Sequence, residues 1–246
     1  MEQLKLELYN PAIFKDVFDC ISHIVDECKL EFDNLGLKIN ALDKSHITFI
    51  NLEFKYDLFD SYQVPNPESI LIDTLQFLKI LKRCGNQDVL KLETDESNLI
   101  LTFEGDATKT FKLRLIDNEY ETPKPPSIDY PVTVTVPSNL IKENLSDMKL
   151  FSDNFKISVD EDYLRLLADG QSGETETKYL HGSHITKYVK SSYAIEKVTD
   201  IFRCSKLSEE VELKLGDDLP ITVTFKLVTD DGSVSFLLAP RIDAEG

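Results

Sequence analysis

Lys29-Leu-Glu-Phe-Asp33, followed by Leu37-Lys-Ile-Asn-Ala-Leu-Asp43, is a strand-like block that occurs twice in this chain. It returns as Lys156-Ile-Ser-Val-Asp160 followed by Leu164-Arg-Leu-Leu-Ala-Asp169, 127 residues further on. A second block, Asp88–Glu93, returns at a spacing of 122 residues. Solenoid repeats are about 20–50 residues long, so two blocks that repeat at nearly the same larger spacing predict a duplicated domain.

Alternation of apolar and polar residues extends outward from these blocks. The alternating segments are short, rich in β-branched and aromatic residues, and separated by acidic turns such as Asp33–Gly36 and Asp95–Asn98. This pattern is typical of antiparallel strands. The predicted strands are 28–32, 37–41, 46–50, 89–93, 99–103 and 111–115 in the first half, and 132–136, 155–159, 164–167, 211–215, 221–225 and 234–238 in the second.

Four further segments carry apolar residues at the helical period instead. They are 11–25, 73–83, 138–149 and 192–204, and each starts at a candidate cap or proline, namely Asn10-Pro11, Asp73, Pro137-Ser138 and Ser191-Ser192. The predicted fold class is therefore α+β, with two duplicated domains of antiparallel sheets and two helices in each domain.

A proline-rich segment separates the two copies. Asp117–Pro131 holds four prolines and four acidic residues in fifteen positions. Proline lacks the amide donor that a sheet needs and favours extended backbone, so we expect an exposed connector here. The predicted domains are 1–116 and 132–246, joined by the connector 117–131.

The charge balance is strongly acidic, with 44 acidic against 27 basic side chains and a net charge of −17. This excludes a protein that binds nucleic acid over its whole surface, because such binding needs an excess of lysine and arginine. The basic residues concentrate on the predicted helices. Segments 10–25, 73–85, 137–150 and 191–206 together hold nine basic and seven acidic side chains, and the rest of the chain carries −19.

The sequence contains none of the common catalytic motifs. Its glycines form no phosphate-binding or dinucleotide-binding loop, and neither Gly-x-Ser-x-Gly nor His-Glu-x-x-His occurs. His181-x-x-His184 has no neighbouring cysteine, which favours a polar loop over a metal site. The four cysteines form no Cys-x-x-Cys pair and no apolar run reaches 18 residues, so we expect reduced thiols and no membrane span. We therefore expect that the protein is not an enzyme and binds no cofactor or metal. A hydrolase or transferase would need a catalytic site, and the sequence displays none.

The segment Leu35-Gly-Leu-Lys-Ile-Asn-Ala-Leu-Asp-Lys-Ser-His-Ile-Thr-Phe-Ile-Asn-Leu52 resembles the DNA sliding clamps of archaea and eukaryotes, the proliferating cell nuclear antigen family. Lys79-Ile-Leu-Lys-Arg-Cys-Gly-Asn-Gln-Asp88 and Phe236-Leu-Leu-Ala-Pro-Arg-Ile242 agree with it, in the same order along the chain. The resemblance implies a noncatalytic processivity factor: a homotrimeric ring, with helices lining the hole, that encircles duplex DNA without reading sequence. A subunit of a heterotrimeric clamp, archaeal or of the checkpoint type, is the alternative.

The resemblance also implies the partners. They are the clamp loader (replication factor C), DNA polymerase and other replication and repair proteins that carry a clamp-binding peptide motif. The C-terminal Phe236–Arg241 and the connector favour an archaeal source, hence a nucleoid-associated protein of the cytoplasm; a eukaryotic clamp would be nuclear.

Three groups of site residues follow from the same resemblance. Those expected to face DNA are Lys15, Lys79, Lys82, Lys149, Lys197 and Arg203. Edge strands at about 109–116 and 174–180 are expected to pair between subunits, with Arg83, Lys109, Lys112, Arg114, Glu143, Asp147, Lys178 and Leu180 at that interface. Lys82 and Arg83 could serve either the DNA or the interface.

The third group forms a pocket for the partner peptide. Its members come from the Asp43-x-x-His46 region, the connector and the second domain: Leu42, His46, Ile47, Phe49, Pro123, Pro125, Pro126, Ala194, Pro220, Leu237, Ala239 and Pro240. For Leu42, Ile47 and Phe49 the alternative is that the side chain belongs to the core of a strand. The connector has Pro-Lys-Pro-Pro where the family commonly has Leu-x-Ile-Pro. The sequence therefore does not predict which partner peptide the pocket prefers.

Overall fold

The computed structural model describes residues 3–117, 119–185, 187–227 and 229–241, which form two compact units. Unit 1 consists of Met1–Lys44, Ile50–Pro125 and Leu227–Val234, and unit 2 of Ser45–Phe49, Pro126–Lys226 and Ser235–Gly246. Each unit therefore takes in a short segment from the other half of the sequence. The Lys55 amide donates to the Asp231 carbonyl at 2.8 Å in unit 1, and the Ala239 amide to the Ile47 carbonyl at 2.8 Å in unit 2.

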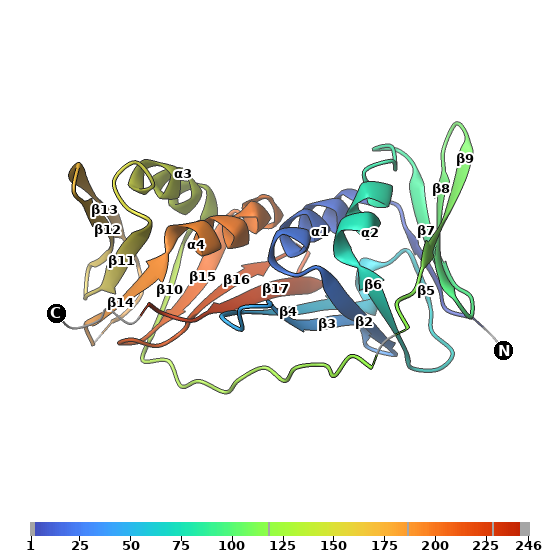
Figure 1. Ribbon diagram of the computed structural model, residues 1–246, viewed down its shortest axis with the longest axis horizontal. Helices are drawn as coiled ribbons and strands as arrows, with labels where there is room; N and C mark the ends of the chain where they lie inside the picture. Colours follow the sequence, from blue (N-terminus) through green and yellow to red (C-terminus); the bar gives the residue numbers. More distant parts are fainter. Residues whose placement is uncertain (1–2, 118, 186, 228, 242–246) are drawn as a thin grey trace. The chain divides into compact units, whose positions relative to one another are not determined.

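The strands of unit 1 form one sheet in the order β5-β1-β7-β8-β9 and a second set in the order β4-β3-β2-β6 (Figure 1). Every pairing register described for them is antiparallel. Strand β9 is one of the two edge strands of the first sheet, and β5 is the other. The strands are β1 Lys5–Leu8, β2 Glu27–Asp33, β3 Gly36–Leu42, β4 Thr48–Lys55, β5 Ser61–Gln63, β6 Glu68–Asp73, β7 Val89–Thr94, β8 Asn98–Glu104 and β9 Thr108–Arg114.

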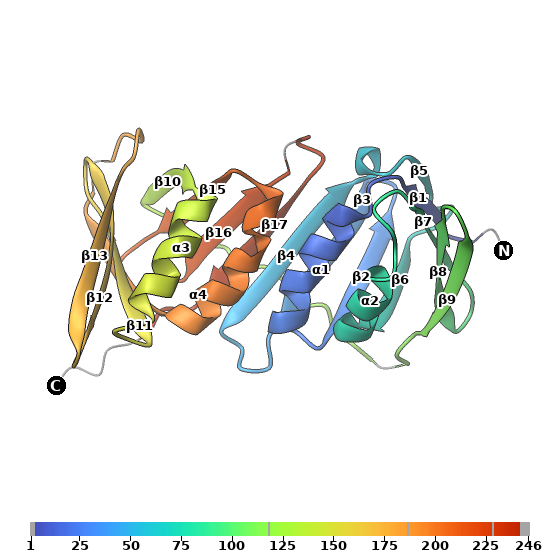
Figure 2. The same cartoon turned by 90° about the horizontal axis from the view of Figure 1, so that it is seen from above.

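The helices α1 (Ala12–Ile24) and α2 (Thr74–Leu81) lie on one face of the β4-β3-β2-β6 set (Figures 1 and 2). Their apolar faces form the core of the unit. Phe18 of α1 meets Phe77 of α2 edge to face, with ring centroids 4.6 Å apart, and both side chains are completely buried. The aromatic faces of the two helices therefore pack against each other, and their polar faces point outward.

Unit 2 repeats this plan with a sheet in the order β13-β12-β11-β14 and a set in the order β10-β15-β16-β17. Helices α3 (Ser138–Met148) and α4 (Ile195–Ile201) lie against it (Figure 2), and a 3₁₀ helix, Phe202–Leu207, continues α4. The strands are β10 Val132–Pro137, β11 Asn154–Val159, β12 Tyr163–Gly170, β13 Gly173–Leu180, β14 Val189–Ala194, β15 Glu210–Leu215, β16 Ile221–Lys226 and β17 Gly232–Leu238.

The α+β prediction and the duplication are confirmed. The first copy of the repeated block forms the hairpin β2–β3, and the second copy forms the hairpin β11–β12. The cap predicted for α2 is also confirmed, because the Asp73 carboxylate accepts the Gln76 amide at 2.7 Å. The position of the domain boundaries stays a prediction, and position 118 of the connector lies outside the described residues.

The prediction of a helix over 192–204 is wrong at its start. Residues 192–194 belong to β14, where Ser192 pairs in register with Lys156, and α4 begins only at Ile195. Tyr193 is fully buried and its hydroxyl donates to the Leu219 carbonyl at 2.6 Å, which holds this segment in the sheet. The strand predicted at 46–50 also starts later, at Thr48, because His46 has a positive φ of 59°.

Candidate nucleic-acid interface and protein-binding surfaces

The helices of unit 1 carry three of the cations expected to face DNA, and their surroundings differ. Lys79 is exposed on α2, and it has no ion pair with another described residue. Lys82 lies just after α2 and pairs with Asp19 of α1 at 2.8 Å. The half-buried Lys15 of α1 donates its ammonium to the Cys84 carbonyl at 2.7 Å. Lys15 and Lys82 thus link α1 to the end of α2, which leaves Lys79 the most available of the three.

Unit 2 supplies the other three cations. Lys149 is exposed at the C-terminal end of α3. Lys197 of α4 is half-buried, and Arg203 in the following 3₁₀ helix pairs with Asp200 at 3.3 Å. Part of the basic charge on these helices is therefore balanced by neighbouring acids, so each helix pair presents a weakly rather than strongly cationic surface.

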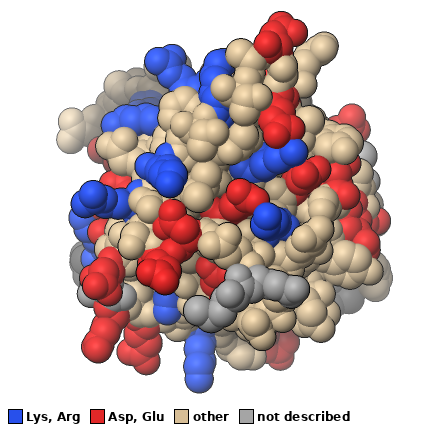
Figure 3. All heavy atoms as spheres, turned by 90° about the vertical axis from the view of Figure 1, so that its right-hand side faces the viewer, with Lys and Arg blue, Asp and Glu red and all other residues tan. Residues whose placement is uncertain are grey.

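Strand β9 presents the basic group predicted for the subunit interface. Lys109, Lys112 and Arg114 are all exposed on it, and Lys112 lies 3.9 Å from Asp95. Arg83, which follows α2, is exposed as well. Figure 3 looks onto this end of unit 1 and shows basic side chains interspersed with acidic ones. As an edge strand of its sheet, β9 has an unpaired backbone edge that another strand could use.

Strand β13 and helix α3 expose more acidic than basic side chains in unit 2. β13 is the outermost strand of its sheet, and its Glu174 and Glu176 are exposed, the latter paired with Lys178 at 2.9 Å. Glu143 and Asp147 are exposed on α3. Leu180, at the end of β13, keeps 76 % of its surface exposed.

A cluster of polar side chains that the sequence did not indicate joins α3 to β13. The Asn144 amide group of α3 donates to the Tyr179 hydroxyl at 2.5 Å, and its oxygen accepts from the Thr177 hydroxyl. Burial, together with the charges of Glu143 and Asp147, raises the pKa of Tyr179 to about 12. An asparagine inside an amphipathic helix has no sequence signature that would have revealed these contacts.

The residues predicted for the peptide pocket come from both units. In unit 1, Leu42 and Pro123 are half-buried and Pro125 is exposed. In unit 2, His46 and Pro126 are exposed, and Ile47 keeps 36 % of its surface exposed. Phe49 is buried in β4, so its side chain belongs to the core.

The remaining pocket residues all lie in unit 2 and share a half-buried state: Ala194, Pro220, Leu237, Ala239 and Pro240. Backbone hydrogen bonds bring three of the contributing segments together. The Ala239 amide bonds the Ile47 carbonyl, and the Arg241 amide bonds the Ser192 carbonyl at 2.8 Å. The loop before β4, strand β14 and the segment after β17 thus lie side by side in unit 2.

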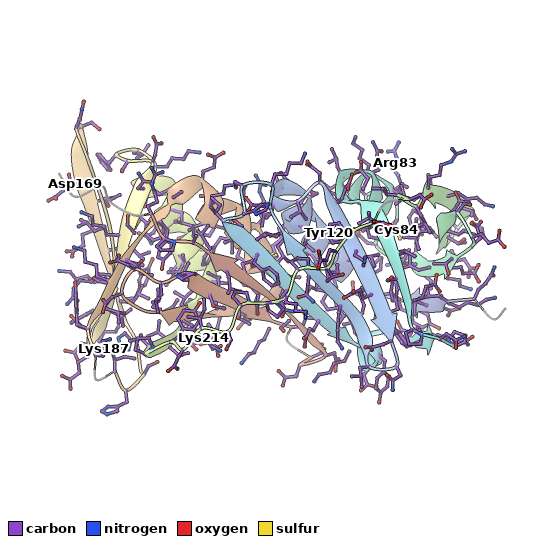
Figure 4. The ribbon with its side chains drawn as sticks, turned by 60° about the horizontal axis from the view of Figure 1, so that its bottom comes forward. Arg83, Cys84, Tyr120, Asp169, Lys187 and Lys214 are labelled. Atoms are coloured by element: carbon purple, nitrogen blue, oxygen red, sulfur yellow. The ribbon has the colours of Figure 1, made fainter. Side chains whose placement is uncertain are left out.

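The connector is anchored by tyrosines near its two ends, and the sequence pattern did not indicate these contacts. Tyr120 lies on the connector, where Figure 4 labels it. Lys29 of β2 donates to the Tyr120 carbonyl at 2.5 Å, and its ammonium lies 5.7 Å from the Tyr120 ring centre. In unit 2, the Thr222 hydroxyl donates to the Tyr130 hydroxyl at 2.8 Å. Pro123, Pro125 and Pro126 therefore lie between two anchored residues.

Several titratable groups of the described residues have shifted pKa values. The largest lowering is at Asp160, where two backbone amides and Arg165 bring the carboxyl pKa to about 2. All four cysteines are buried as thiols, and burial raises the pKa of the Cys28 thiol. Within the described ranges, no three His, Cys, Asp or Glu side chains converge as metal ligands. No described helix is long and apolar enough to cross a membrane.

Two similar α+β units, each with a helix pair on its sheet, are the arrangement of the DNA-clamp fold. Residues 3–122 match the family description "Proliferating cell nuclear antigen, N-terminal domain", and residues 124–241 match "Proliferating cell nuclear antigen, C-terminal domain". The chain belongs to the proliferating cell nuclear antigen family.

Individual relatives agree with this assignment. The DNA polymerase sliding clamps of Methanobrevibacter smithii and Methanothermobacter thermautotrophicus are each 46 % identical over 241 residues, covering 98 % of this chain and 99 % of theirs. A crystal structure of the antigen from Thermococcus kodakaraensis has a TM-score of 0.90 at 28 % identity, over 97 % of this chain and 100 % of that one. The corresponding structure from Entamoeba histolytica, at 23 % identity, shares the fold with a TM-score of 0.92 over 98 % of this chain and 100 % of its own.

Proposed function

We propose that this chain is an archaeal DNA polymerase sliding clamp. The observation that carries the proposal is the similarity over nearly the full length to two archaeal relatives of that name, together with the duplicated clamp fold. A clamp performs no chemistry. It increases processivity by keeping a polymerase attached to its template.

The charge distribution supports loose binding around duplex DNA. The predicted helical segments hold nine basic and seven acidic side chains, whereas the rest of the chain carries −19. Basic helices attract phosphates without reading bases, and acidic sheets and loops repel DNA. Because Lys82 and Arg203 are already paired with acids, contacts to the phosphates stay weak, and a clamp that must slide requires weak contacts.

We propose a homotrimer as the assembly. The exposed cations of β9 and the exposed acids of β13 and α3 lie on two different units of the same chain. Pairing of β9 from one copy with β13 of the next would bring these opposite charges together and would satisfy both unpaired strand edges. A head-to-tail contact of this kind closes into a ring when the rotation between copies allows it.

The proposed partners are duplex DNA, a clamp loader, DNA polymerase and other proteins with a clamp-binding peptide. The half-buried apolar residues of unit 2 around Ile47 and Ala239 would receive the apolar anchors of such a peptide. The protein would act in the cytoplasm, at the nucleoid.

Primer extension tests the function. An archaeal replicative DNA polymerase copies a long primed template together with a clamp loader and ATP, in the presence or absence of this protein. We expect much longer products from a single binding event when the protein is present. Unchanged product length, with a loader proven active on its own clamp, would refute the proposal.

A further inference from the structure

Asn144 lies in the middle of α3, where its side chain is half-buried and all of its polar atoms are used. The amide nitrogen donates to the Leu140 carbonyl at 2.9 Å and to the Tyr179 hydroxyl, and the amide oxygen accepts from Thr177. The Tyr179 hydroxyl in turn bonds the Leu140 carbonyl at 3.1 Å. One side chain thus ties a full helical turn to the outermost strand of the sheet.

The position of this cluster is notable because acids flank it. Glu143 precedes Asn144 and Asp147 lies three residues after it, and both carboxylates raise the pKa of Tyr179. The two acids therefore lie near the hydroxyl that Asn144 holds. Fixing α3 against β13 sets the position of both carboxylates relative to the strand edge.

Charge complementarity indicates what this surface meets. α3 and β13 expose four acids, Glu143, Asp147, Glu174 and Glu176, against two lysines, Lys142 and Lys178, whereas β9 of the same chain exposes Lys109, Lys112 and Arg114. Leu180 adds an exposed apolar side chain at the end of β13. A second copy of this chain, approaching with its β9, supplies both the strand edge and the opposite charge.

We propose that Asn144 is a positioning residue for the contact between copies, holding α3 on β13 so that Glu143 and Asp147 meet the cations of the next copy as a preformed surface. This inference rests on the proposed homotrimer. A preformed surface loses less conformational freedom on association, so affinity rises without an additional contact. Asn144 acts through the two acids and the strand; it is not itself required to touch the partner.

The test compares the oligomeric state of the full-length wild-type chain with that of Asn144→Ala. Sedimentation equilibrium over a range of concentrations, at about 0.1 M and 0.5 M NaCl, gives the concentration at which half of the trimer has dissociated. Removal of a hydrogen-bonded side chain should raise this concentration roughly tenfold in low salt. Because screening already weakens exposed pairs, the rise from low to high salt should be smaller in the variant than in the wild type.

Asn139→Ala is the matched control, since Asn139 is exposed near the start of α3 and has no side-chain hydrogen bond with a described residue. It should behave as the wild type. If Asn144→Ala does not fold by circular dichroism, Tyr179→Phe replaces it, removing only the hydroxyl, with an expected rise of several-fold.

Three other outcomes of the sedimentation experiment would overturn the proposed role of Asn144. A folded variant with an unchanged dissociation midpoint overturns the role of Asn144 while leaving the trimer intact. A raised midpoint with unchanged salt dependence also overturns it, because Asn144 would then act on the fold rather than on the acids. A wild-type chain that stays monomeric at all concentrations overturns the proposed trimer and this inference together.

Discussion

The substitution Phe18→Ala tests how the helices of unit 1 are held in place. The Phe18 ring is fully buried, meets Phe77 at 4.6 Å and lies 6.0 Å from Phe14. Truncation of a buried phenylalanine costs about 3–5 kcal/mol, and loss of an edge-to-face partner adds about 0.5–1.5 kcal/mol. We therefore expect the free energy of unfolding of unit 1 to fall by about 4 kcal/mol, with α1 and α2 losing protection together.

Urea unfolding followed by circular dichroism and tyrosine fluorescence measures this change, since the chain has no tryptophan. Hydrogen exchange with mass spectrometry assigns it to peptides of α1 and α2. Tyr56→Ala is the matched control, because Tyr56 is an aromatic residue of the same unit with 49 % of its surface exposed; it should cost less than about 1 kcal/mol. A loss below about 1.5 kcal/mol for Phe18→Ala, or one no larger than that of the control, would refute the reasoning.

Three further predictions concern single side chains. Asp73→Ala removes the carboxylate that caps α2 and should lower the free energy of unfolding by about 1 kcal/mol, measured by urea unfolding; an unchanged midpoint would show that the cap is dispensable. Asp160 has a folded-state pKa of about 2, below its ordinary value, so its stabilising effect is present above about pH 4 and disappears as the pH falls toward 2. Thermal melts of wild type and Asp160→Asn should therefore converge across that range, and a constant gap would contradict the assignment. Lys79→Gln removes one phosphate-binding cation and should lower the salt dependence of duplex binding by up to about one unit of slope. The effect should exceed that of Lys82→Gln, whose ammonium already sits in an ion pair; equal effects in a filter-binding titration would count against this ranking.

Most of the architecture could be predicted because it depends on short-range pattern. The period-2 segments and the repeated block predict the hairpins β2–β3 and β11–β12, and the 3.6-residue period locates all four described α-helices to within a few residues. The error at 192–194 has a clear physical cause. Ser191 and Ser192 precede a helical pattern and read as its cap, but burial of the Tyr193 ring and strand pairing with β11 outweigh the local preference.

The site was less accessible from sequence, because its properties depend on contacts between distant residues. Charge counting identifies Lys79 and Lys82 equally, yet only the fold shows that Lys82 is paired with Asp19, 63 residues away. The Asn144–Tyr179 contact spans 35 residues and leaves no periodic signature. The roles of these residues at DNA, at the partner peptide and between copies stay predictions.

Topological retention on DNA tests the central claim most directly. The protein is loaded by a clamp loader onto a nicked circular plasmid, and the fraction bound after gel filtration in high salt is compared before and after one restriction cut. We predict that the protein stays on the closed circle and is lost from the linear molecule, because a ring that encircles DNA loosely can leave only over an end. Equal retention on both forms, or loss from both, would contradict the proposal that this chain encircles DNA.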